Sequence, residues 1–138
     1  MKSEIYKGGC LCGKVRFEIT GGIRNIVCCH CSECRKAQGS AFATNGVVDT
    51  DKFIIKTGRE DLTGYQYTAV QTKYFCKHCG SPIMSVNTTR PDVVRIRLGT
   101  IESDINEKPT AHIFATSKAN WENITDDLPR YETYEPGR

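Results

Sequence analysis

The feature that most constrains this chain is its cysteine spacing. Four cysteines and one histidine stand within the seven residues 28–34. Thiolates bind zinc at short range, and ligands that are close in sequence lose little chain entropy when a site closes. Two further pairs flank this segment, Cys10 with Cys12 before it and Cys76 with Cys79 after it. The eight cysteines therefore indicate metal binding by clusters that are far apart in sequence.

The length of the chain suits one domain with a buried core, and we expect a single domain over residues 1–138. The N-terminal residues contain no apolar signal core, and no run of about 18 apolar residues could span a membrane. Many cysteines without a secretory signal favour bound metal in a reducing compartment. We therefore predict a cytoplasmic protein with no membrane partner, and a disulfide framework is the alternative.

The charge of the chain gives little reason to expect a nucleic-acid partner. The formal net charge of +3 counts cysteines as neutral, and seven thiolates around two zinc ions would change it to 0. The basic side chains are spaced through predicted strands and form no stripe with interleaved aromatic residues, as the positions of Lys73, Lys77, Arg90, Arg95 and Arg97 show.

Alternation of polar and apolar residues predicts β-strands. In residues 14–20, Val15, Phe17 and Ile19 share one face. In residues 93–98, the same period points Val94, Ile96 and Leu98 inward and Arg95 and Arg97 outward. Further extended segments are predicted at 40–48, 53–57, 65–67, 70–75 and 111–115.

Helical signals are confined to one short stretch. Ser32 can cap one or two helical turns over residues 33–38, which Gly39 ends. The segment from Trp121 onward contains Pro129 and Pro136 and is expected to be irregular. The predicted fold class is mainly β: antiparallel sheets in a single domain stapled by zinc, with few short helical turns.

The cysteines can be divided between two metal sites in two ways. In the first, Cys10, Cys12, Cys76 and Cys79 form a four-thiolate structural site, and Cys29, Cys31 and Cys34 hold a second zinc with an open fourth position. In the second, Cys31 and Cys34 pair with Cys76 and Cys79 as a zinc ribbon, and the remaining cysteines form another site. The spacing alone favours neither division.

The order of these motifs resembles the glutathione-dependent formaldehyde-activating enzyme family, which also includes the domain of centromere protein V. The similarity rests on Gly9–Gly13, Cys29–Arg35 and Phe75–Gly80, and it continues to His112–Phe114 and to Trp121 with Leu128-Pro129. It implies the first division of the cysteines and two zinc ions per chain, one structural and one catalytic. It also implies a β-tent fold and a carbon–sulfur lyase activity on adducts of a thiol and an aldehyde.

A zinc ion with three thiolates carries a net charge of −1, which weakens it as a Lewis acid but lets it hold a fourth thiol as a thiolate. We therefore predict Cys29, Cys31 and Cys34 as catalytic zinc ligands that present a small-molecule thiol such as glutathione to a small aldehyde such as formaldehyde. Arg35 and Lys36 stand just after them and are predicted to bind the carboxylates of glutathione, although solvated charges are the alternative.

Other residues near the motifs are expected to have simpler roles. His30 and Glu33 are the nearest groups for proton transfer, but a residue between two ligands often points away, so exposed side chains are expected. Cys28 is expected to be a buried thiol outside both sites. We further expect His78 to be exposed, His112 to be half-buried with its hydrogen bonds satisfied, and Trp121 to cover the core.

Two other functions remain open at this point. The chain could be a non-catalytic zinc-stapled β domain that binds a protein or nucleic-acid partner. It could also be a redox or zinc-buffering protein whose open site exchanges metal.

Overall fold

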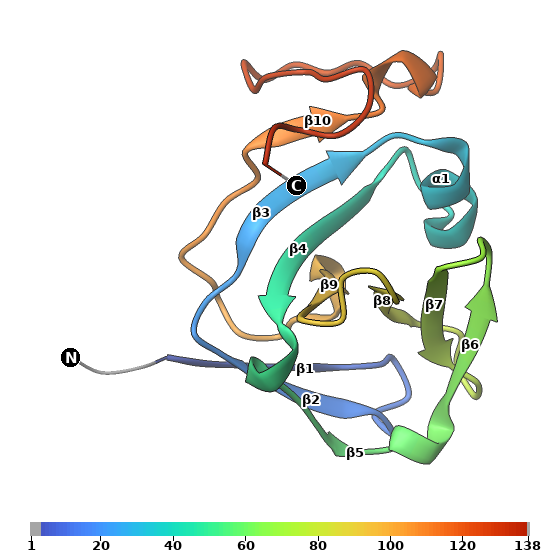
Figure 1. Ribbon diagram of the computed structural model, residues 1–138, viewed down its shortest axis with the longest axis vertical. Helices are drawn as coiled ribbons and strands as arrows, with labels where there is room; N and C mark the ends of the chain where they lie inside the picture. Colours follow the sequence, from blue (N-terminus) through green and yellow to red (C-terminus); the bar gives the residue numbers. More distant parts are fainter. Residues whose placement is uncertain (1–3, 138) are drawn as a thin grey trace.

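A computed structural model describes residues 4–137 of the chain and shows two β-sheets that share a core (Figure 1). The smaller sheet has the order β1-β2-β5, with β1 at Ile5–Gly9, β2 at Arg16–Thr20 and β5 at Phe53–Thr57. In Figure 1 it lies below the larger sheet. The prediction of a mainly β fold is confirmed.

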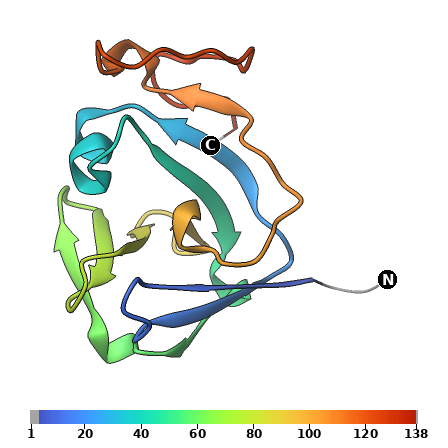
Figure 2. The ribbon, with the colours of Figure 1, turned by 180° about the vertical axis from the view of Figure 1, so that it is seen from behind.

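The larger sheet has seven strands in the order β10-β3-β4-β9-β8-β7-β6. Its pairs are antiparallel except for β10 with β3, which are parallel. The strands are β3 (Arg24–Cys29), β4 (Ala43–Asp49), β6 (Leu62–Gln66), β7 (Gln71–Cys76), β8 (Pro82–Asn87), β9 (Val93–Arg97) and β10 (Ala111–Ile113). Seen from behind, the chain after β10 runs along the outer edge of this sheet, beyond β10 (Figure 2).

Helices are short in the described residues. The α-helix α1 covers Ser32–Gln38, and 3-10 helices cover Thr50–Lys52 (η1), Arg59–Asp61 (η2), Leu98–Thr100 (η3) and Ala115–Ser117 (η4). No helix in this part of the chain has the length and apolarity needed to cross a membrane. The segment after η4 contains no helix or strand up to residue 137, as predicted for the region from Trp121.

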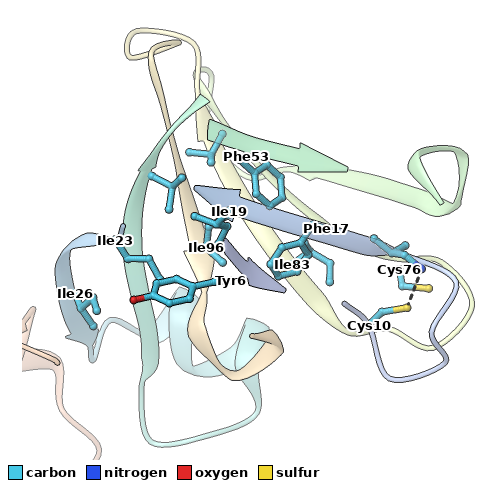
Figure 3. Close-up of a cluster of buried hydrophobic side chains, with 13 residues drawn as sticks. Tyr6, Cys10, Phe17, Ile19, Ile23, Ile26, Phe53, Cys76, Ile83 and Ile96 are labelled. Carbon is cyan, nitrogen blue, oxygen red and sulfur yellow. Dashed lines mark hydrogen bonds between the residues drawn. The ribbon is translucent and has the colours of Figure 1, made fainter. Parts of the chain in front are cut away.

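The core lies between the two sheets (Figure 3). On β2, Phe17 and Ile19 are fully buried, as the alternating pattern predicts, and Ile83 and Ile96 come from the larger sheet. Each such side chain stabilises the fold by about 1.5–3 kcal/mol through removal of apolar surface from water. Cys10 and Cys76 lie at one end of this cluster with their sulfur atoms toward one another.

The prediction for the strand at residues 93–98 is wrong in its outward face. Arg97 is buried, with 4% of its surface exposed, although the alternating pattern placed it in solvent. In β9 one face packs on the core and the other faces a cavity, so both faces are largely enclosed. Period-two alternation identifies a second face with polar residues, but it does not distinguish solvent from a polar cavity.

Glu107 fastens the loop before β10 to the smaller sheet. Its carboxylate accepts hydrogen bonds from the Tyr6 hydroxyl at 2.7 Å and from the Ile23 backbone N–H at 2.8 Å. Burial alone would raise the pKa of this carboxyl, but the bonds from Ile23 and Tyr6 outweigh burial. The pKa of Glu107 therefore lies below its usual value.

Glu107→Gln is expected to lower the free energy of unfolding at pH 7 by about 1–3 kcal/mol, because both donors lose a charged acceptor. A carboxyl with a lowered folded pKa stabilises the fold above its unfolded pKa of about 4.3, and this stabilisation is lost as the pH falls through the folded pKa. Urea unfolding of both proteins should therefore show a difference that shrinks below about pH 5. Thiolates are also protonated in acid, so the test is the difference in unfolding free energy between wild type and Glu107→Gln at each pH. A difference that does not change with pH would contradict the prediction.

Candidate metal centres and their cavity

The structure brings together four cysteine sulfurs from two distant loops. Cys10 and Cys12 lie in the loop between β1 and β2, and Cys76 and Cys79 lie at the turn between β7 and β8. All four sulfurs lie within 4.8 Å of one another. The Sγ atoms of Cys10 and Cys12 are 3.5 Å apart, and those of Cys12 and Cys76 are 3.7 Å apart. Tetrahedral zinc with Zn–S bonds of about 2.3 Å has sulfur–sulfur edges of about 3.8 Å, so this group fits such an ion.

Each of these two loops is closed by a backbone turn that ends at a glycine. Gly13 and Gly80 follow the second cysteine of each pair with φ angles of 82° and 79°. Their N–H groups donate to the carbonyl oxygens of Cys10 and Cys76 at 3.1 and 2.8 Å. Glycine adopts this left-handed conformation without steric cost, and the turn directs both sulfurs of the pair to the same side.

A second group contains Cys29, Cys31 and Cys34, whose sulfurs also lie within 4.8 Å of one another. Cys29 ends β3, Cys31 is the N-cap residue of α1, and Cys34 lies in its first turn. The Cys31 side chain, rather than the predicted Ser32, accepts from the Cys34 backbone N–H at 3.3 Å. Gly39 ends the helix in the left-handed conformation, as predicted. The described part of the chain offers no fourth His, Cys, Asp or Glu atom to this group.

The thiols of the second group differ in pKa. Cys29 donates toward Cys31 across a distance of 3.6 Å between their Sγ atoms. The bonds from Cys29 and Cys34, with the positive charge of Lys73, lower the pKa of the Cys31 thiol to about 2. The bond to Cys31 raises the pKa of Cys29. Cys31 is therefore the first thiol of this group to ionise, and a metal ion would displace the proton on Cys29.

The second group lies in the wall of a cavity of about 570 Å³. This volume falls within the range of about 300–1,000 Å³ that is typical of small-molecule sites. Polar and charged side chains from strands across the larger sheet line the cavity, among them Asn45, Tyr67, Lys73, Ser85, Asn87, Arg90, Arg95 and Arg97. Burial raises the pKa of Tyr67 to about 12, so its phenol stays protonated at neutral pH and remains a hydrogen-bond donor.

Comparison with known proteins identifies the family of this chain. The model of the glutathione-dependent formaldehyde-activating enzyme family matches residues 5–117. The chain belongs to this family. A Halomonas elongata protein named after the family is 30% identical over 128 residues, which cover 87% of this chain and 81% of that protein.

Two further matches to this family member are more distant. An uncharacterized lyase of Schizosaccharomyces pombe is 26% identical over 78 residues, which cover 56% of this chain and 55% of that protein. A solved structure of a Rhodobacter sphaeroides protein has a TM-score of 0.62 and 26% identity, and the match covers 75% of this chain and 97% of that chain.

The structure of this family member groups its sulfurs as the first division predicts, and it keeps Cys31 and Cys34 apart from Cys76 and Cys79. Cys28 is buried and belongs to neither group, as expected. The prediction for Trp121 is wrong, since 66% of its surface is exposed. His78 is exposed, as expected, and its Nε2 lies 2.7 Å from an Asp61 carboxylate oxygen.

Arg35 and Lys36 do not line the cavity. Arg35 donates from Nε to the His30 carbonyl oxygen at 3.2 Å and from a terminal nitrogen to the Ser117 carbonyl oxygen at 3.3 Å. Its guanidinium therefore holds the segment that contains His30 against η4. The cations that do line the cavity come from β7, β9 and the loop before β9, namely Lys73, Arg90, Arg95 and Arg97. Sequence spacing did not predict this cluster of cations, because strand pairing, and not proximity in sequence, brings its members together.

His30 lies between two of the predicted ligands, yet it is completely buried, so the expectation of an exposed side chain is wrong. Its Nε2 is 2.8 Å from His112 Nδ1, and His112 Nε2 lies 3.0–3.1 Å from the two carboxylate oxygens of Asp126. Burial and nearby positive charges lower the pKa of His30 to about 4, so it is neutral at pH 7. His112 is buried with both ring nitrogens hydrogen-bonded.

The direction of this hydrogen-bond chain follows from the carboxylate. The bond from His112 lowers the pKa of Asp126, so its oxygens accept and His112 Nε2 carries a proton. In neutral His112 the other nitrogen then accepts from His30 Nε2–H. His30 Nδ1 has no hydrogen-bond partner among residues 4–137. These hydrogen bonds thus hold His30, the middle residue of Cys29–Cys31, in the protein interior.

Proposed function

We propose that this chain is a zinc-dependent carbon–sulfur lyase that interconverts a thiol, a small aldehyde and their hydroxymethyl thioether. Glutathione and formaldehyde are the proposed pair, because the family is named for them. One zinc ion is proposed for Cys10, Cys12, Cys76 and Cys79 and a second for Cys29, Cys31 and Cys34.

One observation carries the proposal: three sulfurs that fit a metal ion, with no fourth donor among the described His, Cys, Asp and Glu residues, lie in the wall of a cavity of ligand size. Four protein ligands saturate zinc in structural sites, whereas three protein ligands with an open position are typical of catalytic sites. When bound, zinc would hold the substrate thiol as a thiolate at this open position.

The side chains of the cavity suit the proposed reaction. The substrate sulfur forms a bond to the aldehyde carbon, the carbonyl π bond becomes an alkoxide, and the proton that the thiol lost returns to that oxygen. Tyr67 is a neutral proton donor in the same wall, and its phenol can hydrogen-bond the developing alkoxide. Lys73, Arg90 and Arg95 supply positive charge for the carboxylates of a thiol such as glutathione.

The proposal is tested by exchange NMR with ¹³C-formaldehyde, glutathione and zinc-replete protein. Wild-type protein is expected to accelerate formation of the S–CH₂ bond at least ~10-fold over buffer, because positioning and thiol ionisation both lower the barrier. Cys31→Ala should lose this acceleration, whereas Cys28→Ala, which removes a buried thiol outside both groups, should keep it. Wild-type protein that holds two zinc ions but gives no acceleration overturns the proposal.

A further inference from the structure

Arg97 is a buried cation in the cavity wall. Only 4% of its surface is exposed, and one of its terminal nitrogens donates to Asn45 Oδ1 at 2.7 Å. No carboxylate within residues 4–137 forms an ion pair with it. Arginine keeps its charge in proteins, and a buried charge without a counter-charge is strongly disfavoured. The fold must therefore offer another source of negative charge near this guanidinium.

The sulfurs of Cys29, Cys31 and Cys34 are the candidates, because they line the same cavity as Arg97. The carboxylate among the cavity-lining residues is that of Glu33, which is exposed on α1. Cys29 and Cys34 are buried, as Arg97 is, so water screens a charge on this sulfur group only weakly from the guanidinium.

The charges of a loaded site complete the argument. Three thiolates around a divalent ion carry a net charge of −1 inside a partly enclosed cavity. Arg97 carries +1 and is fixed by Asn45, so this one buried side chain can offset the net charge of the centre. A pair of opposite charges in a medium of low dielectric constant is stabilised far more than the same pair in water.

We propose that Arg97, held in place by Asn45, is the counter-charge of the metal centre formed by Cys29, Cys31 and Cys34, and that it sets the affinity of this centre for its ion. This inference rests on the metal site of the proposed function. Asn45 is suited to the role because its amide oxygen accepts from the guanidinium without neutralising it. An acidic residue in its place would bind the guanidinium more strongly but cancel its charge.

The test is the zinc affinity of the second site, measured by competition with a chromophoric chelator in protein whose four-cysteine site stays loaded. Arg97→Met should weaken zinc binding roughly 10- to 100-fold, the size expected for loss of one nearby charge, whereas Arg97→Lys keeps the charge and should lose less. Asn45→Asp should weaken binding by a similar factor while it preserves or raises thermal stability, because it forms an ion pair with Arg97.

Arg90→Met is the matched control. It removes the same unit of charge from an exposed side chain at the edge of the cavity, which is paired with Asp92 and 47% exposed, so the affinity should change less than about 2-fold. If Arg97→Met does not fold, Asn45→Asp still decides the question. Unchanged zinc affinity in Asn45→Asp overturns the proposal, as does an equal loss in Arg90→Met.

The affinity measurement is separate from turnover. A charge-dependent zinc site without acceleration of S–CH₂ bond formation would overturn the proposed function and leave this inference intact. Acceleration of S–CH₂ bond formation together with a zinc affinity that does not change in the Arg97 and Asn45 variants would support the proposed function and overturn this inference.

Discussion

Replacement of Cys76 by alanine is expected to unfold the protein at 25 °C. Cys76 is completely buried, and its sulfur belongs both to the shared core and to the four-cysteine group. This group joins the β1–β2 loop of the smaller sheet to the β7–β8 turn of the larger one. Structural zinc contributes about 10–16 kcal/mol of apparent binding free energy to such sites, whereas a whole domain is stable by about 5–15 kcal/mol.

Two other cysteines provide controls for this experiment. Cys28→Ala removes another buried thiol, one that belongs to neither group, so it should cost about 1 kcal/mol and leave the zinc content per chain unchanged. Cys31→Ala should keep the fold and lose one ion, because its group lies within a single segment at the cavity. Far-UV circular dichroism and zinc content per chain are the measurements. Equal stability of Cys76→Ala and Cys28→Ala would show that the four-cysteine group does not hold the sheets together.

Much of this architecture could be predicted from local sequence patterns. The alternation around Phe17 and Ile19 identified β2, and Gly39 marked the end of α1. Three strands, β1, β3 and β8, were not among the predicted segments. β1 ends in Gly8-Gly9, and β8 begins with Pro82 beside a shift in register with β7, and these residues have low strand propensity.

The parts that could not be predicted depend on long-range contacts. His30 and His112 are 82 residues apart in sequence, and the parallel pairing of β10 with β3 brings them together. The cations of the cavity come from β7, β9 and the loop between β8 and β9, and Arg35, the nearest cation in sequence, turns away to bind backbone carbonyls. The family resemblance therefore predicted the two sulfur groups, which spacing alone left open, but nothing in the sequence predicted the charges that line the same cavity.

The second large effect is expected at His112, where alanine should lower the free energy of unfolding by about 3–5 kcal/mol. The substitution leaves a cavity in place of a side chain that is 3% exposed. It also removes the hydrogen-bond partner of His30 Nε2, so both ring nitrogens of that buried side chain lack a partner. The zinc affinity of the second site should fall as well, because His30 lies between Cys29 and Cys31 in the loop that presents their sulfurs.

Two milder variants separate the contributions of this hydrogen-bond chain. His112→Asn places an amide oxygen near the position of Nδ1, so it can still accept from His30 and should recover part of the loss. Asp126→Asn changes only the exposed end of the chain and should have the smallest effect. Urea unfolding in zinc-saturated buffer should therefore rank the variants in the order His112→Ala, His112→Asn and Asp126→Asn, from most to least destabilised. If His112→Ala and Asp126→Asn differed by less than about 0.5 kcal/mol, the buried bond to His30 would not be what stabilises this part of the fold.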